Sequence, residues 1–298
     1  MFRCLRPVSA SAIFILAMGS AAFAADLEPA ASVYKAPAYK APVVSGPYNW
    51  TGFYVGGNAG YGWGHADNDI DFASGPSFNV GQGPGDPFPA FAHSDPLKLN
   101  GANGGGQIGY NWQFTRTGVV GIEADFQATN PKNSSQFVDS FSLSDHADNE
   151  TILSGTTATD QQARISWFGT VRGRLGYAFG NVMLYGTGGL AYGKVGLSGT
   201  IASTETLTIF GNAPLTTSTP TNYAGSSVNV GWTAGAGIEG AIAGNWTWKA
   251  EYLHVDLGSV MVTGTAPTGV AFTAKSGDFT DDIVRVGVNY RFGPTAVH

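Results

Sequence analysis

The chain has 298 residues, of which 43 are glycine, and only 12% are charged while another 12% are aromatic. This composition is unusual for a water-soluble globular domain, and together with alternating segments it is typical of an all-β chain with close backbone packing. The formal net charge of −6 argues against nucleic acid as a partner. Beyond the N-terminus, no stretch is long and apolar enough to form a membrane helix.

The N-terminus, residues 1–24, has the features of a secretory signal peptide. Arg3 and Arg6 precede an apolar run over residues 10–19, and a small-x-small motif predicts cleavage near Ala24. Cleavage would remove Cys4, the single cysteine, so we expect no disulfide in the mature chain. It would also leave 13 basic side chains against 21 acidic ones, a net charge of −8.

Residues 25–48 are predicted to form a Pro-rich periplasmic tether, which leaves residues 49–298 as one domain. The sequence Tyr-Lys-Ala-Pro begins at Tyr34 and is repeated from Tyr39. Pro-rich repeats of this kind stay extended and do not pack. We interpret the segment as a spacer. The alternative is that its Lys and Tyr side chains contact the cell wall or a neighbouring protein.

From Trp50 onward, apolar and polar residues alternate in eight runs. A period of two predicts strands that each have one apolar face and one polar face. Taking every second residue, the apolar faces in chain order are residues 53–63, 108–114, 120–128, 165–177, 182–192, 228–238, 246–252 and 284–292.

The connections between these runs alternate strictly between long and short. The long ones are polar segments without a period and are predicted loops, at residues 67–96, 130–162, 198–225 and 256–281. The short ones are turns at residues 116–118, 179–180 and 244–245. Transmembrane barrels have short periplasmic turns and long external loops, and only helices or closed barrels satisfy their backbone in lipid. We therefore expect an all-β, eight-stranded, antiparallel transmembrane up-and-down β-barrel with four long external loops.

The distribution of aromatic residues favours an apolar face that meets lipid. Aromatic side chains near strand ends suit the interfacial girdles of membrane barrels, and here they are Trp50, Tyr61, Trp63, Trp112, Trp246, Trp248 and Tyr290. A soluble lipocalin-like barrel or a sandwich would instead turn the apolar face inward. The opposite face is largely Gly, Asn, Thr and Ser, which suits a narrow lumen.

The same alternation assigns ten charged side chains to the lumen. They are Glu123, Asp125, Arg164, Arg172, Arg174, Glu239, Lys249, Glu251, Arg285 and Arg291. Buried charges are costly unless paired, so we expect these six basic and four acidic groups to form ion pairs. Counting from the short turns brings Glu239 opposite Lys249, with Ile242 facing Trp246, and sets Glu123 and Asp125 near the two arginines of the neighbouring strand. Such a network would fill and rigidify the lumen. The alternative is a small gated conduit.

Four segments resemble the small outer-membrane β-barrel proteins of alphaproteobacteria, the immunogenic, opacity-like relatives of the outer-membrane protein A barrel. They are WTGFYVGGNAGYGWG at 50–64, LYGTGGLAYG at 184–193, KAEYLHVDLG at 249–258 and VGVNYRF at 286–292. The resemblance implies an outer-membrane structural protein whose partners are outer-membrane lipids, lipopolysaccharide and the assembly machinery. It also implies that Tyr290 and Phe292 form the assembly signal. Family barrels commonly end on an aromatic residue, whereas here residues 293–298 follow Phe292, so either Phe292 still serves or assembly is slower.

We expect a structural protein that contributes to envelope integrity and is exposed at the cell surface. The alternatives are a small-conductance porin, or an adhesin or receptor whose external loops, with exposed aromatics at Phe72, Phe78, Phe88 and Phe91, meet a host surface. The last alternative is a lipid-modifying barrel enzyme that uses His254, Asp256 and Ser259 near a rim. We do not expect an enzyme, because these residues lack the spacing of a catalytic triad. We expect no cofactor and no metal, because the five histidines do not cluster.

Overall fold

The computed structural model describes residues 48–77, 86–130, 132–144, 151–209 and 211–293. The predicted signal peptide, and the predicted tether apart from Tyr48, lie outside these residues. Among the described residues, no helix is long and apolar enough to cross a membrane. The secondary structure of the described chain consists of the strands β1 (Gly52–Phe72), β2 (Phe91–Gln113), β3 (Gly118–Thr129), β4 (Lys132–Ser144), β5 (Thr151–Phe179), β6 (Val182–Ile209), β7 (Leu215–Ala243), β8 (Trp246–Asp256), β9 (Met261–Thr265), β10 (Ala271–Ser276) and β11 (Thr280–Phe292).

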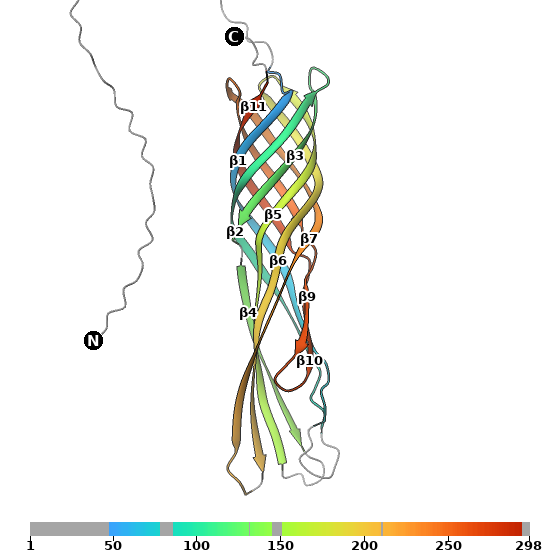
Figure 1. The fold of residues 1–298 in the computed structure, drawn as a ribbon, viewed down its shortest axis with the longest axis vertical. Coiled ribbons are helices and arrows are strands. Elements are labelled where there is room, and N and C mark those ends of the chain that lie inside the picture. Colours follow the sequence, from blue (N-terminus) through green and yellow to red (C-terminus); the bar gives the residue numbers. More distant parts are fainter. Residues whose placement is uncertain (1–47, 78–85, 131, 145–150, 210, 294–298) are drawn as a thin grey trace, which may run out of the picture. The chain divides into compact units, whose positions relative to one another are not determined.

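Eight of these strands form a closed antiparallel ring. They pair in the order β1-β2-β3-β5-β6-β7-β8-β11, and β11 pairs again with β1. Following the register around the ring from Tyr54 leads back to β1 at Gly64, so the strands are strongly tilted (Figure 1). The other three strands lie outside the ring: β4 pairs with β5, and the β9–β10 hairpin pairs with β1.

The wall of the ring carries its large apolar side chains outward and polar or small side chains inward. Leu175 and Val286 are 66% and 61% exposed, whereas the side chains beside them in sequence, Arg174 and Arg285, are buried. The two-residue period of a strand produces this division directly, because successive side chains point to opposite faces. The ring is therefore apolar on its outer surface and polar within its middle part, with buried apolar side chains toward both ends.

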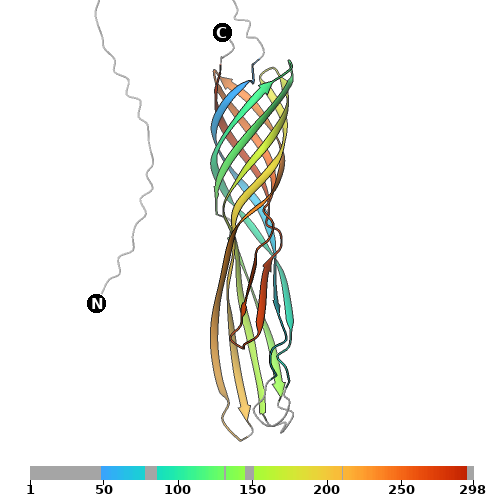
Figure 2. The same cartoon turned by 45° about the vertical axis from the view of Figure 1, so that its right-hand side comes forward.

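The segments predicted as long loops are largely strand, which corrects the sequence analysis. β1 continues to Phe72, β2 begins at Phe91, and β5, β6 and β7 run for 29, 28 and 29 residues. Figure 2 shows the long strands continuing from the ring without a break. We call this part the extension, and it comprises the described residues within 65–101, 132–165, 195–229 and 257–279.

In the extension, the apolar side chains turn to the inside. On β1 the last outward apolar side chain is Trp63, and the next apolar residues, Ala66, Ile70 and Phe72, are buried. They belong to one buried apolar cluster with side chains of β2, β4, β5, β6, β7 and β10. This change of face interrupts the apolar period, which is why the extension was misread as loop.

Three of the four aromatic residues that were expected to be exposed on external loops belong to this cluster or pack against it. Phe72 is buried and its ring lies 4.4 Å from that of Phe91. Phe88 and Phe91 are partly buried and pack against the cluster. Phe78 lies outside the described residues. The expectation of exposed aromatic side chains is therefore wrong for Phe72.

The short turns lie where they were predicted, with one difference in register. Gly180 and Gly244 adopt positive φ angles of 62° and 56°, a conformation that glycine reaches without strain. Near the third turn, at residues 244–245, Trp246 faces Ala243 rather than Ile242, because the register shifts between Ala241 and Ala243. Beyond this bulge, Glu239 faces Lys249 as counted.

A second register shift, between Ile165 and Trp167 on β5, reverses the predicted sidedness of two residues. An extra residue in one strand turns the side chains beyond it to the opposite face. Ile165, expected to point outward, is 2% exposed and belongs to the buried cluster of the extension. Arg164, expected in the lumen, is exposed on the outer surface. The assignment of Arg164 to the lumen is wrong for this reason.

Candidate functional site

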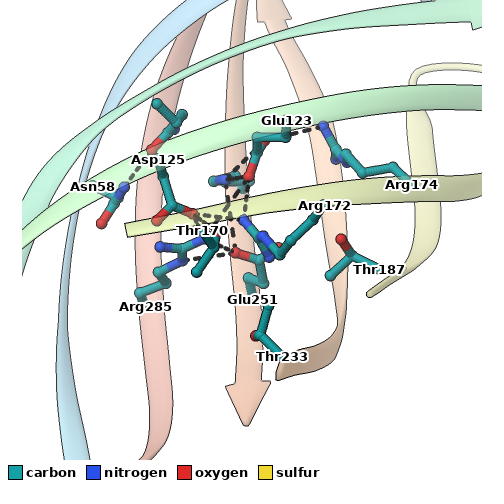
Figure 3. A network of polar contacts seen from close by, with 12 residues as sticks. Asn58, Glu123, Asp125, Thr170, Arg172, Arg174, Thr187, Thr233, Glu251 and Arg285 are labelled. Atoms are coloured by element: carbon teal, nitrogen blue, oxygen red, sulfur yellow. Dashed lines mark hydrogen bonds and ion pairs between the residues drawn. The ribbon is translucent and has the colours of Figure 1, made fainter. Parts of the chain in front are cut away.

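Eight charged side chains meet inside the ring and form what we call the lumen network. β3 contributes Glu123 and Asp125, β5 contributes Arg172 and Arg174, and the remaining members are Glu239, Lys249, Glu251 and Arg285. All eight are buried. Figure 3 shows side chains from different strands pointing toward one another across the lumen. Strand alternation places each of them inward, and ring closure brings them together.

Arg172 and Arg285 share two carboxylates at the centre of the network. Arg172 donates to Glu251 Oε1 at 2.9 Å and to Asp125 Oδ2 at 2.8 Å. Arg285 donates to the other oxygen of Glu251 at 2.7 Å and to the same Asp125 oxygen at 2.9 Å. Charge-assisted bonds of this kind are stronger than neutral ones. Each carboxylate is thus held by two cations.

Glu123 links this centre to a lysine on the opposite wall. It accepts a hydrogen bond from Arg172 and also pairs with Arg174 at 3.4 Å. Lys249 Nζ donates to both oxygens of Glu123, at 3.0 and 3.2 Å, and lies 3.7 Å from Glu251. The expected proximity of β3 carboxylates to β5 arginines is therefore observed.

Besides Glu123, Arg174 contacts a second carboxylate and two tyrosines. It donates to Glu239 Oε2 at 2.8 Å and to the Tyr54 hydroxyl at 2.8 Å. Its guanidinium carbon lies 3.9 Å from the centre of the Tyr185 ring, a cation–π contact. Tyr54 donates in turn to Glu123 at 2.7 Å. The sequence analysis did not include Tyr54 and Tyr185 in the network, although strand alternation turns both inward.

Glu239 and Lys249 face each other in the register but do not pair directly, contrary to the expectation. Glu239 is bonded to Arg174, to the Thr247 hydroxyl at 2.7 Å and to Asn289 at 3.1 Å. Lys249 pairs instead with Glu123 and Glu251. A side chain in a narrow closed ring can reach across the lumen, so its ion-pair partner need not be its register partner.

The lumen network is electrically balanced. Sequence alternation assigned six basic and four acidic groups to the lumen, whereas the structure turns Arg164 outward and places Arg291 inward but beyond the network, at the end of the ring near the short turns. Four cations and four carboxylates remain. A buried charge without a partner is costly, so equal numbers of cations and carboxylates favour burial of these eight groups together.

Arg291 lies at the end of the ring near the short turns, where the residues before β1 cover it. Its Nε donates to the Tyr48 hydroxyl at 3.1 Å, and its guanidinium stacks over the Tyr48 ring at 4.7 Å. A second nitrogen donates to the Thr51 carbonyl at 2.7 Å. Trp50 is 1% exposed and packs on Tyr48. Trp50 was predicted in an interfacial girdle, so that assignment is wrong.

The apolar cluster of the extension covers the other end of the lumen. Phe168, Leu253 and Ile283 lie inward on their strands just beyond the network, and each is at most 1% exposed. An aromatic cap, a charge network and an apolar cluster therefore follow one another along the inside of the ring.

The remaining predicted residues lie on the outer surface. Tyr290 and Phe292 point outward on β11, with ring centroids 5.1 Å apart. His254 Nδ1 lies 2.7 Å from Asp282 Oδ1, whereas Asp256 accepts from Trp232 Nε1 at 3.2 Å. Within the described chain, no group of three or more His, Cys, Asp or Glu side chains could hold a metal ion.

Comparisons with known proteins support the same architecture. The family model described as "Outer membrane protein beta-barrel domain" matches residues 11–292. The chain belongs to this family. Its relatives include the 31 kDa outer-membrane immunogenic protein of Brucella melitensis, which is 34% identical over 289 residues, covering 93% of this chain and 98% of the relative. Another is the 22 kDa outer membrane protein of Rhizobium leguminosarum, 27% identical over 250 residues, with coverages of 82% and 79%.

Family membership identifies the chain as an outer-membrane β-barrel protein of the alphaproteobacterial immunogenic type. The predicted outer-membrane location is thereby confirmed. Neither relative carries the name of an enzyme. Among solved structures, the attachment invasion locus protein Ail of Yersinia pestis aligns with 77% of this chain and 98% of its own, at 14% identity and a TM-score of 0.28.

Proposed function

We propose that this outer-membrane protein is a structural, surface-exposed barrel whose eight ring strands span the membrane and whose lumen does not conduct. Its outward apolar wall would face lipid, where a closed ring satisfies every backbone group. Exposed aromatic side chains near both ends of the wall support this orientation. Trp112 and Trp246 lie beside the short turns, and Trp63 and Trp232 lie toward the extension. The turns would then be periplasmic and the extension external.

The observation that supports a non-conducting barrel is that side chains fill the lumen. The side chains of Arg172, Glu123, Lys249 and Arg285 are 0% exposed. Trp50 covers one end of the network and the apolar cluster covers the other. A ring of eight strands is about wide enough to be filled by its own side chains. This arrangement supports a contribution to envelope integrity rather than a small-conductance porin.

Single-channel recording in planar bilayers tests the proposal. The wild-type protein is expected to give no channel events. Replacing Arg172→Ala and Arg174→Ala together should lower thermal stability without opening a conductance, because the apolar cluster still seals the external end. Discrete conductance steps in the double variant would instead identify the network as a gate.

A matched variant and a folding assay complete this experiment. Val171→Ala with Leu175→Ala changes the outward neighbours on the same strand and leaves the lumen intact. Heat-modifiable migration on gels establishes that each refolded protein has a closed ring before recording. Channel events in the wild-type protein would contradict the proposal outright.

Recognition of a partner by the extension is the second candidate function. The extension has a buried apolar cluster of its own, so it can hold a fixed shape beyond the membrane. Its β6–β7 tip exposes the described residues 211–220 to solvent. Exposed segments carried by a rigid scaffold are common binding surfaces. This observation supports an adhesin or receptor role toward a host surface.

A further inference from the structure

The lipid-facing wall ends, on β5 and β6, at two aromatic side chains. The ring centroids of Trp167 and Tyr192 lie 6.2 Å apart, in an edge-to-face arrangement. Directly beyond them the outer surface becomes basic. Lys194 is the register partner of Trp167, and Arg164 is the next outward side chain on β5, across from Lys132 on β4. Three cations from three adjacent strands therefore lie together just past the aromatic belt.

The structure shows no ion-pair partner for these three cations among the residues that it describes. Within the described chain, Lys132, Arg164 and Lys194 form no ion pair with a carboxylate. Their neighbours in the register are each other, Trp167, Gly196 and Val228. Like charges on adjacent strands repel. An anion lying between them would remove this repulsion.

The surface beside Arg164 is shaped to receive a small anion. A hollow of about 120 Å³ is lined by Arg164, Ser198 and Ser226 together with Leu197, Ala224 and Gly225. Gly196 lies between Arg164 and Ser226 in the register. A Cβ at Gly196 would lie 3.3 Å from Arg164 Nε, so the glycine leaves room for the guanidinium to lie across the wall. A guanidinium fork with hydroxyl donors matches the oxygens of a phosphate.

We propose that Lys132, Arg164 and Lys194 bind a phosphate group on the headgroup of an outer-leaflet lipid. Tryptophan and tyrosine belts lie at headgroup depth, and basic side chains just beyond a membrane span recognise charged headgroups. This proposal rests on the membrane orientation proposed above. It assigns a lipid-binding role to Arg164, which the bulge on β5 turns away from the lumen.

Thermal stability in the presence of lipid A tests the site. Refolded protein in detergent micelles is titrated with bisphosphorylated lipid A, and the midpoint of heat-modifiable migration is measured. A ligand that binds only the folded state raises this midpoint. We expect the wild type to gain several degrees. The triple variant Lys132→Gln, Arg164→Gln, Lys194→Gln should lose most of that shift, and Arg164→Gln alone should lose part of it.

Matched controls separate the phosphate site from general charge effects. The variant Lys275→Gln with Arg116→Gln removes exposed cations from β10 and from a short turn, and should keep the wild-type shift. Dephosphorylated lipid A should give little shift with any protein. A full shift with dephosphorylated lipid A, or in the triple variant, would overturn the proposal.

Two further measurements distinguish a lipid ligand from free phosphate and test whether the substitutions alter the stability of the ring. Inorganic phosphate alone, at the same molar concentration, should give no shift; an equal shift would assign the site to free phosphate and contradict a lipid role. Heat-modifiable migration without lipid A should be the same in all variants, because the substituted side chains are on the outer surface. Failure of the wild type to insert into vesicles would contradict the proposed membrane orientation instead.

Discussion

At the scale of single residues, the defining feature is the balance of charge inside the ring. Four cations and four carboxylates share hydrogen bonds, and Glu251 accepts from both Arg172 and Arg285. A buried ion pair adds little stability compared with apolar packing, but removing one partner leaves an uncompensated charge. The network should therefore respond asymmetrically to single and paired substitutions.

Glu251→Gln is expected to destabilise the refolded protein by about 3–5 kcal/mol, because two guanidiniums lose a charged acceptor in a closed space. Adding Arg285→Gln restores the balance of charge and should recover part of the loss. Urea unfolding in lipid vesicles measures Glu251→Gln, Arg285→Gln and the double variant, and the double-mutant cycle gives the pairwise energy. Purely additive losses would contradict the assignment of Glu251 and Arg285 as partners. Val286→Ala, on the outer wall, controls for insertion.

At the scale of elements, the segment before β1 and the last strand are joined at the point where the ring closes. Tyr48 and the Thr51 carbonyl both bind Arg291 of β11, and β11 also pairs with β1. The backbone N–H of Trp50 donates a hydrogen bond to Gln113 Oε1 at 2.9 Å. These contacts link the segment before β1 to β11 and β2, beside the β1–β11 pairing that closes the ring. We therefore expect them to stabilise the closed ring.

Tyr48→Ala should destabilise the closed ring by about 3 kcal/mol, because it removes a buried aromatic ring and leaves Arg291 without its cation–π partner. Tyr48→Phe keeps the ring and should cost only about 1 kcal/mol, for one hydrogen bond. Heat-modifiable migration gives the stability order. Amide exchange of residues 289–292 should accelerate in Tyr48→Ala. Equal effects of the two variants would contradict a role for the aromatic ring.

At the scale of the whole described chain, the same strands pass through two environments. In the ring the apolar side chains face outward, and in the extension they face inward around a buried cluster. In the proposed orientation, lipid surrounds the ring and water surrounds the extension, which accounts for this change of side because apolar groups leave water in both cases. The ring and the extension therefore have separate interiors.

Shortening the β6–β7 tip tests whether the extension is a recognition surface. Residues 202–220 are replaced by Asn-Gly, joining Ile201 to Thr221, which are register partners, through a two-residue hairpin turn. No residue of the buried apolar cluster lies between 202 and 220. We therefore expect unchanged heat-modifiable migration and loss of binding to host cells. Adhesion equal to that of the wild type would exclude the tip as the binding surface. Loss of heat-modifiable migration would show that the ring does not form without the tip, contrary to our expectation.

Much of the ring could be predicted from the sequence, because a two-residue alternation directly reports which face a side chain takes. It predicted all eight ring strands, the three short turns and the inward position of nine of the ten assigned charges, all except Arg164. The resemblance at 50–64 and 286–292 predicted the family. Each of these features depends on residues close together in the chain.

The tertiary structure decided what depends on neighbouring strands and on the surroundings. A bulge between Ile165 and Trp167 turned Arg164 outward, and such a shift is visible only when both paired strands are in place. The partners of Lys249 and Arg291 were set by ring closure, which brings distant segments together. The extension was missed because alternation shows that two faces differ, whereas which face is apolar depends on whether lipid or water lies outside.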